Sequence, residues 1–258
     1  LIKAIEDRIA KGKKPKAIIL VHLYGMPSKM DEIMSVTKRY NIPVIEDAAE
    51  ALGSKYKRQS MGTFGEIGIY SFNGNKIITT SGGGALVSNN IKHCDRATFL
   101  ATQARDQAPH YQHSNIGYNY RMSNITAGIG RGQMEVLDKR VSSRRANHAY
   151  YKSLLESDSV FFLDEAEGYF SNRWLSCVLT KSYNQRERIR QALINENIEA
   201  RPLWKPMHKQ PIFEKYPAFT NGVSENLFEK GLCLPSGSNL KNLDLDRVIK
   251  IIKESIDA

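Results

Sequence analysis

A lysine beside glycine-rich backbone is the first residue that could do chemistry. Lys76 lies in SFNGNKIITTSGGG (71–84), between Asn75 and two apolar residues and shortly before three consecutive glycines. A lysine amine attacks carbonyl carbons when its cation is desolvated or otherwise disfavoured. The alternative is an ordinary surface lysine in a hairpin that the glycines close with a loose turn. The chain has 37 lysines and arginines, so residue type alone does not decide between these interpretations.

Asp47 is the second candidate, because it ends a short apolar run, IPVIEDA (42–48). A carboxylate at the end of a strand is what a pyridinium nitrogen needs to stay protonated. Asp47 and Lys76 are 29 residues apart and each follows a predicted strand. Many α/β chains present such a pair by chance, so the surrounding elements decide whether the pair indicates a functional site.

The first half of the chain alternates strand and helix patterns. Buried-strand runs are predicted at 16–22, 42–48, 65–72 and 84–89, and helices at 30–40 and 95–104. Strand, helix, strand favours a parallel sheet with right-handed crossovers, in which ligands bind beyond the carboxyl ends of the strands. A long polar and aromatic loop follows at 105–123.

The second half has a mixed pattern. A helix is predicted from Asn124, its expected cap, to residue 157, with three glycines that should weaken or bend its start. After it come a strand at 174–180, a helix at 185–197, a Pro- and aromatic-rich loop at 200–211, a short helix at 224–230 and a final helix after Leu243. We therefore predict an α/β chain with a large domain at 1–140, followed at 141–258 by a connector helix and a smaller domain.

Composition and charge limit the class of protein. The chain is 41% hydrophobic and 25% charged, without the roughly 20 consecutive apolar residues of a membrane span, which predicts a cytoplasmic globular protein with no membrane partner. The net charge of +10 could attract nucleic acid, but the basic residues are dispersed among acids and no recognition motif accompanies them. We favour a solvated basic surface, which would also suit a small polyanionic substrate.

The three cysteines, Cys94, Cys177 and Cys233, are far apart in the sequence and odd in number. This pattern predicts neither a disulfide framework nor a CxxC metal site. We interpret them as reduced, structural residues and predict no metal site.

Five motifs together resemble a known family. In order, they are VHLYGMPSKMDEI, VIEDAAEALGS, GTFGEIGIYSFNGNKIITTSGGGALV, GYNYRMSNITAGIGRGQ and ARPLWKPMH. They resemble the successive motifs of pyridoxal-phosphate-dependent sugar aminotransferases of the DegT/StrS type. The resemblance implies a fold-type I, aspartate aminotransferase-like large domain with a mostly parallel sheet and a smaller α+β C-terminal domain. The Lys76 segment is most similar to the subgroup that aminates C4 of UDP-linked 4-keto-6-deoxy-N-acetylhexosamines.

The same resemblance implies roles for individual residues. Lys76 would bond covalently to the aldehyde of pyridoxal 5'-phosphate and later shuttle a proton, and Asp47 would pair with the pyridine nitrogen. Ser71 would donate to the cofactor phosphate. Asn119 would reach the phosphate of the neighbouring subunit, which implies a homodimer with shared active sites. Ser71 could instead merely end its strand, and Asn119 could be a turn residue.

Glu50 departs from the family's common pattern, in which a glutamine at this position hydrogen-bonds the phenolic oxygen of the cofactor. A glutamate can do this only if it is protonated or bridged. Further side chains lie in segments that resemble substrate-facing loops, although surface or core packing would explain each of them equally well: His110, Tyr111, His113, Arg201, Trp204 and His208.

The start of the chain resembles the middle of the family's large domain. The phosphate-cupping glycine motif and the ring-stacking aromatic residue of the family's N-terminal segment are not found in this sequence. We therefore expect these 258 residues, in isolation, to bind the cofactor weakly or not at all.

Three functions follow for testing. The first is an aminotransferase that moves an amino group, with L-glutamate as the expected donor, to a nucleotide-linked keto-deoxysugar used in surface glycans or glycoproteins. The second is a related sugar dehydratase, in which histidine replaces the lysine, so Lys76 argues against it. The third is a regulatory or nucleic-acid-binding relative that has kept the fold without the chemistry.

Overall fold

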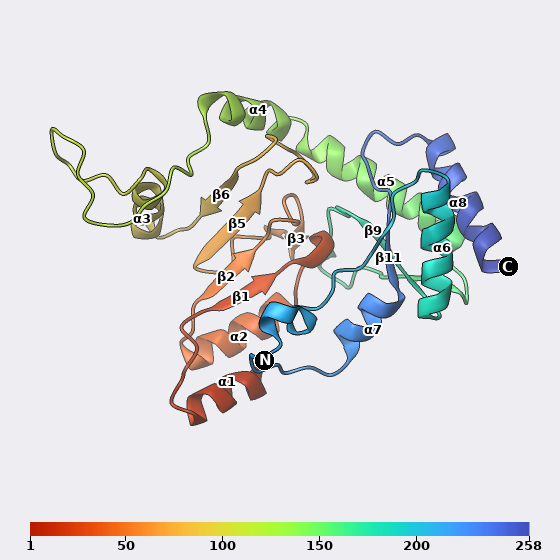
Figure 1. Cartoon of the computed structure of the whole chain (residues 1–258), viewed down its shortest axis with the longest axis horizontal. Coiled ribbons are helices and arrows are strands. Elements are labelled where there is room, and N and C mark those ends of the chain that lie inside the picture. The colour runs from red at the N-terminus through yellow and green to blue at the C-terminus, as the bar shows by residue number, and fades with distance from the viewer. Residues whose placement is uncertain (258) are drawn as a thin grey trace. The chain divides into compact units, whose positions relative to one another are not determined.

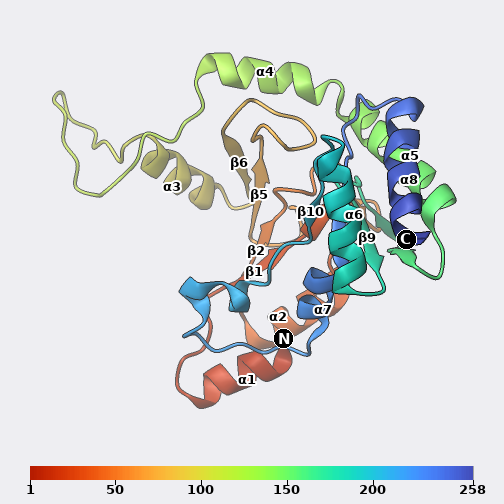
Figure 2. The ribbon, with the colours of Figure 1, turned by 45° about the vertical axis from the view of Figure 1, so that its right-hand side comes forward.

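The computed structural model describes residues 1–257, which form two compact units (Figures 1 and 2). The parallel-sheet unit comprises residues 15–141 and 165–174, and the antiparallel-sheet unit comprises 1–14, 142–164 and the described residues from 175 onward. Two segments therefore differ from the predicted division at residue 140. Residues 1–14 carry a helix that the sequence analysis did not predict, α1 (Ile2–Ala10), and group with the C-terminal part of the chain. Residues 165–174 return to the parallel-sheet unit because β8 (Tyr169–Phe170) pairs with β3 (Lys55–Tyr56).

The four-stranded sheet of the parallel-sheet unit confirms the predicted strands. Its order is β1 (Ile18–Val21), β2 (Val44–Asp47), β5 (Ile67–Ser71) and β6 (Gly84–Val87). The first two pairings are parallel and the last is antiparallel, so the sheet is mostly parallel as expected. The register places Asp47 opposite Val21 on one side and Ile69 on the other. A smaller sheet has the order β4 (Gln59–Ser60), β3, β8.

Helix α2 (Met30–Tyr40) connects β1 to β2 and follows the 3₁₀ helix η1 (Leu23–Gly25). Acidic residues occupy its first turn and basic residues its last, which complements the helix dipole. Met30 is fully buried and packs in a cluster with Ala48, Ala51, Tyr56 and Met61. This packing fixes the turn that follows Asp47, the last residue of β2.

Beyond β6, the chain forms α3 (Ile91–Ala101), an extended segment at 102–123, α4 (Asn124–Met134) and α5 (Leu137–Leu155). The prediction of Asn124 as the helix cap is wrong: the preceding Ser123 is the cap, and its hydroxyl accepts from Thr126 N–H at 3.3 Å. The helix is interrupted at residues 135–136 rather than at the glycines, which α4 accommodates. Glycine weakens a helix but does not break its hydrogen bonds.

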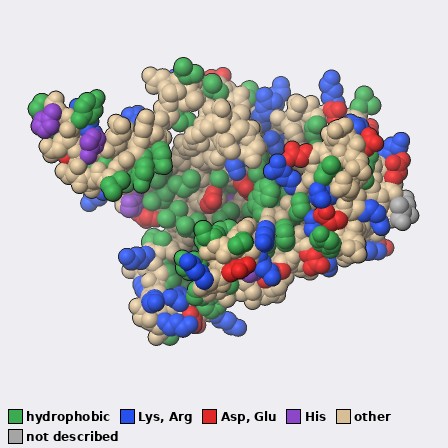
Figure 3. Space-filling view, viewed as in Figure 1, with side chains coloured by type: hydrophobic (Ala, Val, Ile, Leu, Met, Phe, Trp, Pro, Cys, Tyr) green, Lys and Arg blue, Asp and Glu red, His purple; other side chains and the backbone are tan. Residues whose placement is uncertain are grey.

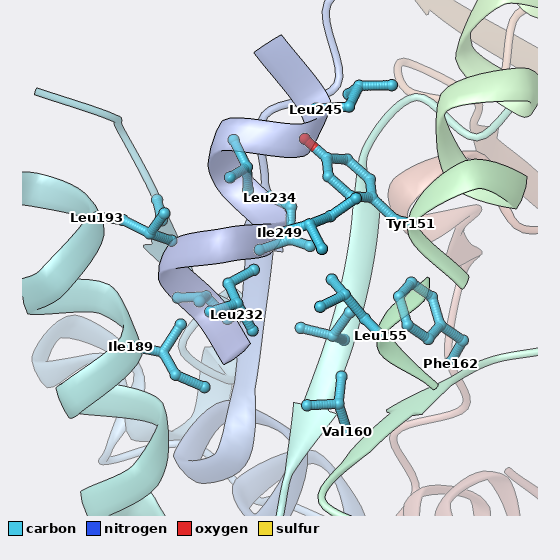
Figure 4. Close-up of a cluster of buried hydrophobic side chains, with 14 residues drawn as sticks. Tyr151, Leu155, Val160, Phe162, Ile189, Leu193, Leu232, Leu234, Leu245 and Ile249 are labelled. Atoms are coloured by element: carbon cyan, nitrogen blue, oxygen red, sulfur yellow. The ribbon is translucent and has the colours of Figure 1, made fainter. Parts of the chain in front are cut away.

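The antiparallel-sheet unit has the strand order β10 (Arg201–Pro202), β11 (Gly231–Leu234), β9 (Ser176–Thr180), β7 (Val160–Phe162). Its C-terminal helices are α6 (Tyr183–Asn195), α7 (Val223–Lys230) and α8 (Asn242–Asp257), with 3₁₀ helices η2 (Met207–Lys209) and η3 (Pro211–Phe213). Helices α6 and α8 lie side by side (Figures 1 and 2). Figure 4 shows the core between these helices and the sheet, where Tyr151, Leu193, Leu232 and Ile249 converge.

Candidate active site

Lys76 is not an ordinary surface lysine. It lies in the turn after β5, where its N–H donates to Asn73 O at 3.1 Å. Its side chain is only 14% exposed. The ammonium nitrogen lies 3.6 Å from Glu50 Oε1 and 4.4 Å from the centre of the Trp174 ring. The structure therefore favours the enclosed amine over the loose surface hairpin.

Trp174 forms one wall of the lysine site, and the sequence analysis missed it. Its side chain is buried, at 2% exposure, and its indole N–H donates to Asn75 O at 2.9 Å. An aromatic face stabilises a nearby cation electrostatically. The ring thus contacts Lys76 and also holds the turn that carries it. The two partners of this hydrogen bond are 99 residues apart in the chain, so no local pattern could have indicated it.

Asn172 anchors this wall to the parallel-sheet unit. The side chain is fully buried, donates to Glu50 O at 2.8 Å and Leu52 O at 2.9 Å, and accepts from Trp174 N–H at 2.9 Å. Its backbone N–H donates to Ser54 Oγ at 2.9 Å. The close fit explains Gly25: its φ is +83°, and a Cβ there would lie 1.8 Å from Asn172 Oδ1.

Glu50 is bridged between a backbone donor and the lysine. Its Oε2 accepts from Tyr24 N–H at 2.6 Å, while Oε1 faces Lys76. Tyr24 has a left-handed backbone with φ of 56°, an uncommon conformation for a bulky residue that needs support from its surroundings. The hydrogen bond to Glu50 provides such support. A glutamate, where many relatives of the resembled family carry glutamine, therefore accepts from Tyr24 N–H and faces the Lys76 amine here.

Asp47 and Ser71 lie at the carboxyl ends of neighbouring parallel strands. Asp47 is paired with Ile69, and side chains two residues apart on a strand share a face, so Asp47 and Ser71 share a face of the sheet. One oxygen of Asp47 accepts from Ala49 N–H at 3.1 Å, which orients the carboxylate. The Ser71 hydroxyl accepts from Asn73 N–H at 3.3 Å and keeps its own proton to donate.

A buried hydrogen-bonded pair, Glu46 and His22, supports the strand end that carries Asp47. Glu46 is fully buried and accepts from Gly62 N–H at 2.8 Å and from Phe64 and Gly65 N–H at 2.6 Å each. His22 Nε2 lies 2.9 Å from the same carboxylate. Although burial raises the pKa of Glu46, the hydrogen bonds from His22, Gly65 and Gly62 hold this pKa below its usual value. The sequence analysis did not single out either residue of this pair.

Four predicted residues lie on the extended segment 102–123, which projects from the sheet at the left of Figure 1. Asn119 is exposed and its backbone forms an isolated bridge with Thr102. The other three contact their own loop: His110 lies 3.4 Å from Gln112 Oε1, Tyr111 lies beneath the Arg105 guanidinium, and His113 lies 2.9 Å from Gln103 O. In Figure 3 this segment carries histidine and hydrophobic side chains at the surface.

The remaining three predicted residues belong to the antiparallel-sheet unit. Arg201 is exposed and pairs with Glu199, and Trp204 is 38% exposed. His208 Nε2 lies 2.7 Å from Glu225 Oε1. The structure therefore brings together Lys76 and Glu50, with Asp47 and Ser71 on neighbouring strand ends. The substrate-binding roles of the six loop residues stay predictions.

This arrangement fits pyridoxal phosphate by the chemistry of its donor set. An enclosed amine can bond to an aldehyde, an oriented carboxylate can accept from a protonated ring nitrogen, and a strand-end hydroxyl can donate to phosphate. Among residues 1–257, no group of three or more His, Cys, Asp and Glu side chains could hold a metal ion. In the same range, no helix is both long enough and apolar enough for a membrane span.

Comparisons with known proteins agree with this donor set. The model of the DegT/DnrJ/EryC1/StrS aminotransferase family matches residues 2–253. EpsN of Bacillus subtilis (strain 168), which has a provisional name as a pyridoxal phosphate-dependent aminotransferase, is 52% identical over 98% of this chain and 66% of its own length. GDP-perosamine synthase of Escherichia coli O157:H7 is 40% identical over 98% of this chain and 68% of its own. The crystal structure of a DegT DnrJ EryC1 StrS aminotransferase from Brucella abortus has a TM-score of 0.88 at 27% identity, covering 97% of this chain and 67% of that one. This chain thus spans about two thirds of the length of these relatives.

Proposed function

The chain belongs to the DegT/DnrJ/EryC1/StrS aminotransferase family, and from this premise we propose that it transfers an amino group from L-glutamate, through pyridoxal phosphate, to the C4 keto carbon of a nucleotide-linked keto-deoxysugar. The observation that carries the proposal is the enclosed Lys76 amine beside Glu50 and Trp174. The Escherichia coli relative is named for a GDP-linked sugar, whereas the Lys76 segment resembles the UDP subgroup. The product would enter surface-glycan or glycoprotein sugar synthesis.

Each residue of the site has a part in this proposal. Pyridoxal phosphate, when bound, supplies an aldehyde that bonds to amines and a ring that withdraws electrons from the adjacent carbon. Asp47 would hold the protonated ring nitrogen, Ser71 would donate to the phosphate, and Lys76 would hold the aldehyde. The contacts of Lys76 Nζ with Glu50 and Trp174 keep the amine in place. As a free amine, the same nitrogen would move a proton to and from the substrate carbon.

The proposal includes a homodimer in the cytoplasm, with no membrane or nucleic-acid partner. Asn119 is exposed, which supports a role toward the cofactor phosphate of a second subunit. Mixed dimers of Lys76→Ala and Asn119→Ala subunits test this sharing. If Asn119 acts across the interface, each mixed dimer contains one site with both wild-type residues, and mixing restores activity. No recovery on mixing would contradict the shared site.

Cofactor spectroscopy tests the role of Lys76 in the natural protein. Bound pyridoxal phosphate should give a visible absorbance band that Lys76→Ala abolishes. Lys92→Ala is the matched control, because Lys92 is an exposed lysine on α3, and it should keep the band. A band that persists in Lys76→Ala would refute covalent attachment at this residue.

A substrate assay tests the reaction itself. The natural protein would receive L-glutamate with GDP-linked and UDP-linked keto sugars, and mass spectrometry would show which sugar gains an amine. Loss of water from the sugar instead would indicate the dehydratase. Salt-sensitive DNA binding without a cofactor band would indicate the regulatory alternative.

A further inference from the structure

We propose that Cys177 and Cys233 form a dithiol site that a two-electron oxidant, a peroxide or a small disulfide, converts into an intramolecular disulfide. The two sulfur atoms lie 3.9 Å apart, and neither cysteine is in a disulfide. The sequence separation of these residues gave no sign of this pair, because the antiparallel pairing of β9 with β11 creates it. The proposal does not depend on the proposed aminotransferase function.

The backbone already has the spacing that a disulfide requires. Cys177 and Cys233 are directly opposite each other in the β9–β11 ladder. Directly opposite residues in antiparallel strands have Cα atoms about 4.5–5.5 Å apart, and disulfides accept about 4.4–6.8 Å. The bond can therefore close through side-chain rotation, without movement of either strand.

The dithiol lies on the face of the sheet away from the hydrophobic core. Val178, Leu232 and Leu234 belong to the core cluster drawn in Figure 4. Side chains alternate between faces along a strand, so Cys177 and Cys233 project from the other face. Cys177 is half-buried and Cys233 is 6% exposed. A small oxidant thus reaches Cys177 first, and Cys233 lies in place to react second.

The chemistry balances with hydrogen peroxide as the oxidant. The Cys177 sulfur attacks one peroxide oxygen, the O–O bond breaks, and a sulfenic acid and one water form. The Cys233 sulfur then attacks the Cys177 sulfur, the S–O bond breaks, and a second water leaves as the S–S bond forms. Two thiols are oxidised by two electrons and the peroxide is reduced to two waters. A reducing compartment would keep the pair as thiols at rest and reverse the bond.

Thiol counting on the intact native protein tests the proposal. After mild peroxide treatment, the number of alkylatable thiols among Cys94, Cys177 and Cys233 should fall from three to one, with Cys94 the thiol that remains. Peptide mapping without reductant should show the peptides of Cys177 and Cys233 linked, with a mass lower by two hydrogen atoms. Dithiothreitol should restore all three thiols. Cys94 is the internal control, since it is also half-buried but lies on α3.

Variants separate the intramolecular bond from general oxidation. Cys94→Ser should lose the thiols of Cys177 and Cys233 together, and Cys177→Ser should form no crosslink to Cys233 under the same treatment. The proposal is overturned if Cys177 and Cys233 both remain thiols, if Cys94 oxidises as fast as the pair, or if Cys177 ends as a sulfinic acid or in a bond between two chains.

Discussion

Replacing Glu46 with glutamine should strongly destabilise the parallel-sheet unit. The carboxylate accepts three backbone N–H groups and lies beside His22 Nε2, two contacts on each oxygen. An amide keeps one oxygen, but its NH2 group cannot accept from the two donors that it faces. A hydrogen bond to a charged group contributes about 1.5–3 kcal/mol. Losing two such bonds, which are not independent, should lower the free energy of unfolding by about 3–5 kcal/mol.

Urea unfolding followed by circular dichroism would measure this loss for Glu46→Gln. Glu66→Gln is the matched control: Glu66 also accepts from a histidine, His93, at 3.0 Å, but its side chain is 47% exposed. An exposed pair of this kind contributes about 0–1 kcal/mol. A loss below about 1 kcal/mol in Glu46→Gln, or equal losses in the two variants, would refute the argument from buried donors.

The pH dependence of the free energy of unfolding gives a second measurement of the contribution of Glu46. Because the pKa of Glu46 is lower in the folded chain than its usual 4.5, the folded state binds the proton less well than the unfolded state. The resulting stability is present above the usual pKa and is lost as the pH falls from 4.5 through the folded value. The stability of Glu46→Gln should therefore fall less steeply over this acid range. Identical slopes would contradict the assignment.

Two further substitutions test the lysine site. Gly25→Ala should lower the melting temperature far more than Gly12→Ala. The new Cβ at position 25 would lie 1.8 Å from Asn172 Oδ1. At Gly12, where φ is +67°, no atom lies within 4 Å of the new Cβ. The Gly12 change should cost only the left-handed penalty of about 1–2 kcal/mol, and equal shifts would mean that the close approach is unimportant. Trp174→Leu should weaken pyridoxal phosphate binding at Lys76 in the natural protein by up to about tenfold, because it removes the indole hydrogen bond to Asn75 O that holds the lysine turn, a bond that contributes about 0.5–1.5 kcal/mol. A cofactor titration followed by visible absorbance would measure it, and an unchanged curve would show that the ring only fills space.

The sequence predicted those strands and helices whose residue pattern is visible within one short segment. The apolar runs at 16–22 and 42–48 and the helical stripe at 30–40 correspond to β1, β2 and α2, because each element is amphipathic or buried along its own length. The cap of α4 was misplaced by one residue, since serine and asparagine cap helices equally well. Strand β11 was missed because four buried residues are too few to show a period.

The residues of the candidate site also fall into two groups, those that the sequence indicated and those that only the structure revealed. Lys76, Asp47, Glu50 and Ser71 occur within motifs whose residues are neighbours in sequence, so they could be found. Trp174 reaches the site through a hydrogen bond to Asn75, a residue 99 positions earlier in the chain. A contact over this sequence separation leaves no local pattern in the sequence. The buried pair of His22 and Glu46 was also missed, because the donors to Glu46 are backbone groups of a distant turn.

The return of residues 165–174 has a consequence for the order in which the chain acquires its site. A ribosome that has made residues 1–164 has completed all four strands of the main sheet and the turn with Lys76, yet neither Asn172 nor Trp174 exists. The hydrogen bonds of Asn172 close loops of 120 and 122 residues, and such long closures form late in folding. The lysine therefore gains its wall only after synthesis has passed residue 174. Any chimera joined at residue 141 would inherit this wall from the donor of its C-terminal half.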